Sequence, residues 1–410
     1  MYLRQLEVER YKAYANRSIL ELLPLTILVG CNSSGKSAIA KATALLAGSL
    51  RVRDSDGSPL PLQALGLNHG VTLHDLLWRH SPHGSLEFGA VFAGHPSGMR
   101  ARLDVVIQSL DSLGGDPVPL VMRWSLAFGD QRFVLERPSV VSEEVRVADG
   151  DQTAIVESVA WHGLSPTLPG SGIPRWVSDL LVELRTWAQG VRYLVSPRCL
   201  ASSPFRLVSR SPLSVTPDGE QTPLILASHD GIRAEVAGFF RKALGTDPDV
   251  HREASFGSLG VRQNGNLVGL AQAGQGLTQL LPVATLLASA PMLGAGLDVI
   301  EHPAAELHPQ AHGDVADFLL ESSGRAERPI VVETHSELIL LRVRRAVAEQ
   351  RIDADDVGIY WVEPDPEHGS SLRRIPLTPE GDVEEWPEGV FYEDYEEILA
   401  IRRAARKQRS

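Results

Sequence analysis

Residues 30–37, GCNSSGKS, have the types and spacing needed to hold a phosphate group. They fit the pattern G-x-x-x-x-G-K-[ST], in which small residues let backbone N–H groups curl around a phosphate. The Lys36 side chain would reach the β- and γ-phosphates of a nucleotide, and the Ser37 hydroxyl would be a ligand of Mg²⁺. The residues predicted to bind ATP are Gly30, Cys31, Asn32, Ser33, Ser34, Gly35, Lys36, Ser37 and Ala38.

The elements predicted on either side of this loop favour phosphate binding. Residues 23–30, LPLTILVG, form a continuous apolar run typical of a strand buried on both faces of a sheet. A helix is expected from Lys36 to about Gly48. The start of that helix would place a partial positive charge beside the loop. This context disfavours the alternative, a glycine- and serine-rich turn that binds nothing.

A second candidate lies at the end of another apolar run, GLDVIEHP, residues 296–303. A carboxylate at this strand end can hold Mg²⁺ or its water ligands opposite the phosphate loop, so Ser37 and Glu301 are the predicted metal residues. His302 follows Glu301. Many ATPases with this arrangement have a second carboxylate there, which activates the attacking water.

The histidine at position 302 decides how fast such a site could hydrolyse ATP. A neutral histidine can accept a proton from water, because its ordinary pKa of about 6.5 lies near neutral pH. Beside Glu301, we expect the cationic form of His302 to be favoured, which would weaken it as a base. Phosphoryl transfer depends mainly on positioning and charge neutralisation, so we expect slow hydrolysis rather than none. Glu306 is a less favoured replacement for the missing carboxylate.

The run PIVVETHSELILL, residues 329–341, predicts a buried strand followed by a helix. Ser336 is a good N-cap for that helix, with Glu337 in its first turn. His335, at the strand end, could reach a γ-phosphate, but a histidine considered alone at such a position is more often structural. The predicted catalytic residues are therefore Glu301, His302 and His335.

A further helix is predicted within AGQGLTQLLPVATLLASA, residues 273–290. Gly274 and Gly276 precede it, and Thr278 would cap it. The predicted apolar face holds Leu280, Ala284 and Leu287. Its N-terminus would be a second phosphate-binding helix end, the alternative being an ordinary loop-to-helix junction.

Taken in chain order, these four motifs resemble the ABC-type ATPase heads of the RecF, SMC and OLD group. The similarity is strongest over residues 1–48 and 262–346, and weaker at YLVSPR, residues 193–198. It is closest to the small ATPases of bacterial defence and uncharacterised operons, which have no coiled coil. The resemblance implies an α/β P-loop NTPase fold of ABC-ATPase type, with ATP and Mg²⁺ as cofactors.

The resemblance also implies how two chains would meet. In such heads two subunits enclose two ATP molecules, and the glycine-led helix of one faces the phosphate loop of the other. The residues implied to act in trans are Gly274, Gly276, Thr278 and Gln279. His335 would be the switch histidine in cis, and Glu301 the Mg²⁺-linked acid. The family has Glu or Gln where this chain has His302.

The pattern of elements predicts four regions. Residues 1–50 and 260–362 would form the ATP-binding core, a mixed or parallel sheet. Residues 51–150 would form an inserted antiparallel lobe, because several short alternating runs lie between 85 and 147. Residues 151–259 would be a mostly helical insertion, and residues 363–410 an acidic C-terminal extension with a basic end.

Composition limits the partners. The net charge of −12 provides no global basic field, so any contact with DNA must come from a local patch. Two cysteines make no disulfide framework, and no apolar run is long enough to span a membrane. We therefore expect a cytoplasmic protein with no membrane partner.

The leading functional hypothesis is an ATP-dependent switch that closes a homodimer or higher homo-oligomer through its ATP sites. It would act on DNA or on a separately encoded nuclease or effector, in phage defence or DNA maintenance. The basic segments 341–347 and 401–410 fit DNA contact, but each also fits a solvated helix face or tail. The alternative is a non-hydrolysing ATP sensor that holds or releases a separate effector.

Overall fold

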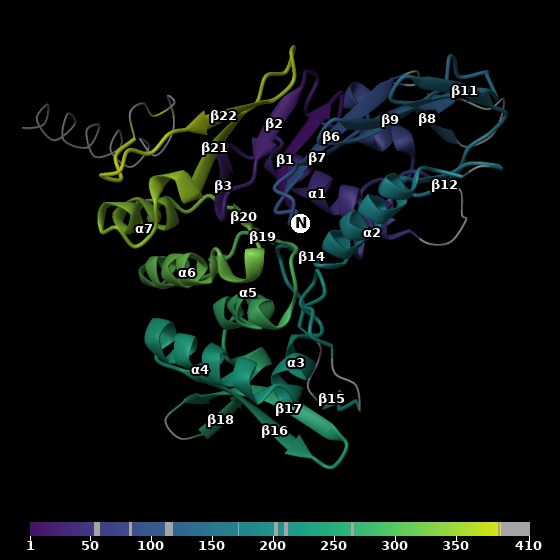
Figure 1. Ribbon diagram of the computed structural model, residues 1–410. Coiled ribbons are helices and arrows are strands. Elements are labelled where there is room, and N and C mark those ends of the chain that lie inside the picture. Colours follow the sequence, from purple (N-terminus) through teal and green to yellow (C-terminus); the bar gives the residue numbers. More distant parts are fainter. Residues whose placement is uncertain are drawn as a thin grey trace, which may run out of the picture.

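The segments with candidate chemistry lie on one central sheet, which has six strands in the described residues (Figure 1). This computed structural model describes residues 1–52, 58–81, 84–110, 118–170, 172–200, 204–208, 212–263, 266–383 and 386. The strand order is β14-β19-β20-β3-β21-β22, with only β22 antiparallel to its neighbour. The strands are β3 (Leu25–Gly30), β14 (Val191–Leu194), β19 (Leu297–Glu301), β20 (Ile330–Glu333), β21 (Val357–Glu363) and β22 (Ser371–Ile375).

Helices cover both faces of this sheet, which is why its inner strands are continuous apolar runs. On one face lie α5 (Gln275–Ser289), α6 (Pro309–Ser322) and α7 (Glu337–Ala348). On the other lie α1 (Lys36–Arg51) and α2 (Arg175–Gln189). Figure 1 shows α5, α6 and α7 stacked on one side and α1 and α2 on the other.

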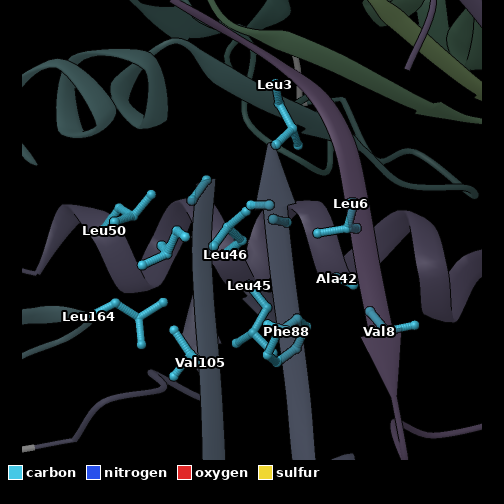
Figure 2. Packing of buried hydrophobic residues seen from close by; sticks show 14 of the residues in the cluster. Leu3, Leu6, Val8, Ala42, Leu45, Leu46, Leu50, Phe88, Val105 and Leu164 are labelled. Atoms are coloured by element: carbon cyan, nitrogen blue, oxygen red, sulfur yellow. The ribbon is translucent and has the colours of Figure 1, made fainter. Parts of the chain in front are cut away.

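A second sheet is antiparallel, and in the described residues it has eight strands in the order β11-β10-β9-β8-β7-β6-β1-β2. Their bounds are β1 (Tyr2–Glu9), β2 (Ser18–Glu21), β6 (Ser85–Ala93), β7 (Ala101–Leu110), β8 (Val118–Phe128), β9 (Gln131–Glu136), β10 (Val145–Asp149) and β11 (Gln152–Val156). Its apolar face packs on α1, where Leu45 and Leu46 meet Phe88 and Val105 (Figure 2). This core fixes α1, and so the residues at its start.

A small subdomain packs beside α5 (Figure 1). It consists of α3 (Thr222–Ser228), α4 (Asp230–Leu244), β15 (Phe205–Arg206), β16 (Asp247–Glu253), β17 (Phe256–Gln263) and β18 (Asn266–Gly269). The remaining strands are β4 (Gln63–Ala64), β5 (Leu67–Asn68), β12 (Ala160–His162) and β13 (Ser165–Thr167). The 3-10 helices are η1 (Leu73–Leu76), η2 (Trp78–His80), η3 (Leu270–Gln272), η4 (Ala290–Met292), η5 (Arg325–Glu327) and η6 (Ala354–Asp356).

The sheets divide the chain differently from the predicted regions. The antiparallel lobe is not confined to 51–150, because β1 and β2 supply one edge and β11 reaches residue 156. The region 151–259 is not mostly helical, since it contains β15, β16 and part of β17. It also contains β14, whose four buried residues pair with β19 in the central sheet.

One predicted helix boundary is also corrected. Helix α1 does not stop at Gly48 but continues to Arg51. Gly48 instead allows a close contact with β4, because a Cβ there would lie 2.4 Å from the Ala64 Cβ. Helices α3 and α4 are separated by one extended residue, His229. Of the C-terminal extension, residues 371–375 form β22, while 384–385 and 387–410 lie outside the described residues. Among the described helices, none combines the length and apolar character required to cross a bilayer.

Candidate nucleotide-binding site

The predicted phosphate loop joins β3 to α1, and its backbone needs glycine at both ends. Gly30 has φ of 152°, and a Cβ there would lie 2.5 Å from the Val362 carbonyl oxygen. Gly35 has φ of 104° and is the N-cap of α1. Its carbonyl accepts a hydrogen bond from the Tyr14 hydroxyl at 3.0 Å. The loop tip, residues 31–33, is exposed, so its backbone is open to a ligand from solvent.

Lys36 lies beneath this loop and is 3% exposed. Its Nζ donates hydrogen bonds to the carbonyl oxygens of Gly30 (3.0 Å) and Cys31 (2.6 Å). Burial lowers the pKa of this ammonium group, although nearby Glu333 opposes the shift. The charge is therefore held against the loop backbone, where phosphate oxygens could replace the two carbonyls as acceptors.

Ser37 meets a carboxylate that the sequence motifs did not identify as a functional residue. Its hydroxyl donates to Glu333 Oε1 at 2.8 Å. Glu333 is 3% exposed, and its second oxygen, Oε2, is buried with no hydrogen-bond partner in the part of the chain described. Burial raises the pKa of Glu333, the charge of Glu301 raises it further, and the Ser37 bond and Lys36 oppose this.

Glu301 lies on the neighbouring strand, in register with Glu333. Its Oε1 accepts the Tyr193 hydroxyl at 2.6 Å, and its Oε2 accepts the Ser196 backbone N–H at 3.1 Å. Lys41, one turn along α1 from Ser37, has its Nζ 3.7 Å from Oε1. Both carboxylates thus project on the α1 face, but the one bonded to Ser37 belongs to β20 rather than β19.

The two predicted catalytic histidines lie together. The rings of His302 and His335 are stacked, with centroids 5.2 Å apart and planes at 14°. His302 Nε2 is 3.9 Å from Glu333 Oε1. Our expectation that Glu301 would favour a cationic His302 is wrong, because burial lowers the pKa of His302, and Lys36 adds to this against the opposing effect of Glu301. Burial also lowers the pKa of His335.

An open cavity of about 390 Å³ adjoins the stacked rings. Its lining residues are Ser196, His302, Ala304, Ala305, Glu306, His312, Thr334, His335 and Ser336. Ser336 is the N-cap of α7, as predicted, with its hydroxyl accepting the Ile339 N–H. Glu306 is exposed and has φ of 60°, so its role as a replacement base stays a prediction.

Helix α5 begins differently from the sequence expectation. Gly274 is its N-cap, with φ of 94°, while Thr278 lies inside the first turn and donates to the Gln275 carbonyl at 2.6 Å. Thr278 is therefore not the cap. A Cβ on Gly276 would lie 2.5 Å from the Glu306 carbonyl oxygen, so this glycine lets α5 approach the segment after β19.

Gln279, expected to act in trans, has its amide bonded within its own chain. Its Oε1 accepts the Arg198 N–H at 2.8 Å, and its Nε2 donates to the Arg198 carbonyl at 2.9 Å. The buried Arg198 guanidinium in turn donates to the carbonyls of Gln279, Glu301 and His302. Burial lowers the pKa of Arg198 to about 10. Arg198 thus ties the start of α5 to the end of β19.

The site has a donor set suited to the magnesium ion of a nucleotide complex. In the described residues, no three His, Cys, Asp or Glu side chains are grouped so as to hold a metal by themselves. Nucleotide-bound Mg²⁺ needs less, since it keeps several waters and takes one or two carboxylates plus phosphate oxygens. The Ser37 hydroxyl and the unpartnered Glu333 Oε2 fit this requirement.

Comparisons with known proteins return structures of SMC heads. No protein-family model matches the chain, and no curated protein matches it. An Smc head bound to the C-winged helix domain of ScpA has 15% identity and a TM-score of 0.49, covering 92% of this chain and 98% of that chain. The SMC head domain from Thermotoga maritima has 14% identity and a TM-score of 0.44, covering 92% and 100%.

A third structure is an Smc head with an extended coiled coil, bound to the C-terminal domain of ScpA, derived from Pyrococcus furiosus. It has 13% identity and a TM-score of 0.45, covering 98% of this chain and 99% of that chain. Likeness at these scores decides neither an activity nor a partner, so the function must be argued from the site itself.

Proposed function

We propose that this chain is an ABC-type ATPase that binds ATP with Mg²⁺ and hydrolyses it slowly to ADP and phosphate. The observation that supports this most is the contact between Ser37, at the start of α1, and a buried carboxylate at the end of a parallel strand. Together with Lys36 under a glycine-framed loop, it gives the cation, hydroxyl and acid that phosphoryl transfer requires.

Each residue then has a definite task. The loop N–H groups and the α1 N-terminus bind the phosphates, and Lys36 neutralises charge on the β- and γ-oxygens. Mg²⁺, when bound, supplies further charge neutralisation. His335 donates a hydrogen bond to the γ-phosphate. His302, which is half-buried and has a lowered pKa, accepts a proton from the attacking water in its neutral form.

We further propose that the active form is a homodimer or higher homo-oligomer closed over the nucleotide. The α5 N-terminus supports this, since Gly274 is exposed and no atom of the described chain lies within 4 Å of a Cβ built there. Gly274, Gly276 and Thr278 of one copy would face the phosphate loop of another.

The proposed biological action is on a separately encoded nuclease or effector, or on DNA, in phage defence or DNA maintenance. The basic segment 341–347 gives little support for DNA contact, because its arginines are largely paired within the chain. Arg342 bonds Asp317 at 2.6 Å, and Arg345 bonds Glu349 at 2.7 Å. If DNA does bind through phosphate contacts, its affinity should fall steeply with salt; a flat salt dependence would contradict those contacts.

The second candidate is a non-hydrolysing ATP scaffold that holds or releases an effector. The observation that favours it is His302, which stands at the end of β19 where a water-activating carboxylate would otherwise be expected.

The deciding experiment is steady-state ATP hydrolysis by the purified chain beside Lys36→Ala and His302→Glu, with assembly state followed by sedimentation. We expect slow turnover that Lys36→Ala abolishes, and ATP-dependent assembly. A higher rate in His302→Glu would show that the histidine limits hydrolysis. ATP binding and assembly without turnover would contradict the ATPase and support the scaffold.

A further inference from the structure

Beside the phosphate loop, only one oxygen of the Glu333 carboxylate is hydrogen-bonded. Oε1 accepts the Ser37 hydroxyl, whereas the buried Oε2 has no hydrogen-bond partner among the described residues. A buried carboxylate oxygen without a partner is rare, because a group taken out of water must recover its lost hydrogen bonds. An atom of this kind beside a predicted metal ligand indicates a cation that completes it.

We propose that Glu333 is a carboxylate of the magnesium shell in the proposed nucleotide site, reached directly or through one water. The inference rests on the proposed ATP binding and adds a residue that the four sequence motifs do not assign.

The sheet places Glu333 where this role requires it. Strand β20 lies directly between β3, which leads to the phosphate loop, and β19. Alternation along the strand puts Glu333 on the same face as Val331, which packs in the cluster with α1. Its carboxylate therefore meets the first turn of α1, where Ser37 lies.

The neighbouring acid differs in its bonding. Glu301 has both oxygens engaged, by Tyr193 and by the Ser196 N–H, with Lys41 nearby. These contacts hold the segment after β14 against the end of β19. Glu301 is thus built to position the backbone beside His302, whereas Glu333 keeps one oxygen available.

The test is equilibrium binding of a fluorescent ATP analogue, titrated with Mg²⁺ and repeated in EDTA. For Glu333→Gln we expect that the Mg²⁺ concentration giving half of the maximal change in analogue binding rises at least tenfold. In EDTA the same variant should bind the analogue at least as tightly as the wild type, because a negative charge near the phosphates is gone. Glu301→Gln should instead weaken binding with and without Mg²⁺ alike.

A second variant tests the same contact by metal preference. Glu333→Cys should gain affinity for the Cd²⁺ complex of the analogue relative to the Mg²⁺ complex, by at least tenfold over wild type, because thiolate ligands prefer softer ions. Circular dichroism melts would establish that each variant is folded before its binding is compared.

The inference is overturned if Glu333→Gln keeps the wild-type Mg²⁺ dependence, or loses affinity equally in Mg²⁺ and EDTA, which is the pattern of a structural residue. It is also overturned if the metal-specific shift appears only in Glu301→Gln. Failure of the wild type to bind the analogue under any condition would overturn the proposed function itself, so the two failures are distinguishable.

Discussion

Glu301 and Glu333 show that two carboxylates at equivalent positions of adjacent strands can have different roles. They are in register on adjacent parallel strands and on the same face of the sheet. One is fully hydrogen-bonded and the other has a free oxygen beside Ser37. Neither the residue type nor the apolar run before it separates these two roles. The contacts with neighbouring elements separate them.

A buried histidine outside the site gives a prediction about pH. His69 is 2% exposed, and burial, together with the charges of Lys12 and Lys41, lowers its pKa to about 4. In the unfolded chain His69 is protonated below a pH of about 6.5, whereas in the folded protein it stays neutral down to about pH 4. Lowering the pH through this window therefore favours the unfolded state, and the free energy of unfolding decreases. Between pH 7.5 and 5 we expect His69 to account for a loss of roughly 2 kcal/mol.

Urea denaturation of the wild type and His69→Gln at both pH values measures this contribution. The glutamine variant does not titrate, so its free energy of unfolding should fall by about 2 kcal/mol less over the same interval. Equal pH dependence in the two proteins would show that folding does not lower the pKa of His69.

Among the secondary-structure elements, α5 and the segment after β19 are held in close approach by a glycine. Gly276→Ala would put a methyl group 2.5 Å from the Glu306 carbonyl oxygen and 3.0 Å from Leu307 Cδ2. Neither backbone segment can move apart without displacing residues that line the cavity beside His302 and His335. We expect a loss of about 1–3 kcal/mol in stability and a lower rate of ATP hydrolysis.

The matched control is Gly238→Ala in α4, where nothing lies within 4 Å of an added Cβ. The same substitution there should stabilise the protein by about 0.5–1 kcal/mol, because alanine has less backbone freedom than glycine to lose when the unfolded chain forms the helix. Opposite signs in thermal melts would support the close approach, and stabilisation at both positions would contradict it.

Local sequence patterns predicted the elements well and their neighbours poorly. Leu280, Ala284 and Leu287 are buried on α5, and Ser336 caps α7, because periodicity and capping act over a few residues. The Ser37–Glu333 contact joins residues 296 positions apart. No local pattern encodes which strand end faces the phosphate loop, because the position of Glu333 beside Ser37 depends on the pairing of β20 with β3.

Over the whole chain, one buried charge network holds the distant segments of the central sheet together. Asp298 is 0% exposed and accepts hydrogen bonds of 2.7 Å from both Arg192 and Arg328. Arg328 also donates to the carbonyls of Gly190 and Gly294. The network joins the α2–β14 turn, the start of β19 and the segment before β20.

Replacing this carboxylate should therefore destabilise the entire protein. Asp298→Asn keeps the volume but leaves two buried guanidinium groups without a counter-charge, and we expect a loss of about 3–5 kcal/mol. Asp179→Asn on α2 is the control, since its pair with Arg175 is largely exposed and should matter by less than about 0.5 kcal/mol. Similar melting temperatures for the two variants would contradict a structural role for the network.

The position of β3 in the central sheet has a consequence for synthesis on the ribosome. Strands β1 and β2 can pair as soon as residue 21 has emerged, but β3 pairs with β20 and β21, which end at residues 333 and 363. At about 5–20 residues per second, the strand that carries the phosphate loop must wait tens of seconds for its partners. A nascent chain can thus bury part of its antiparallel lobe long before it can bind a nucleotide, and truncated products that stop before β20 should not be retained by immobilised ATP.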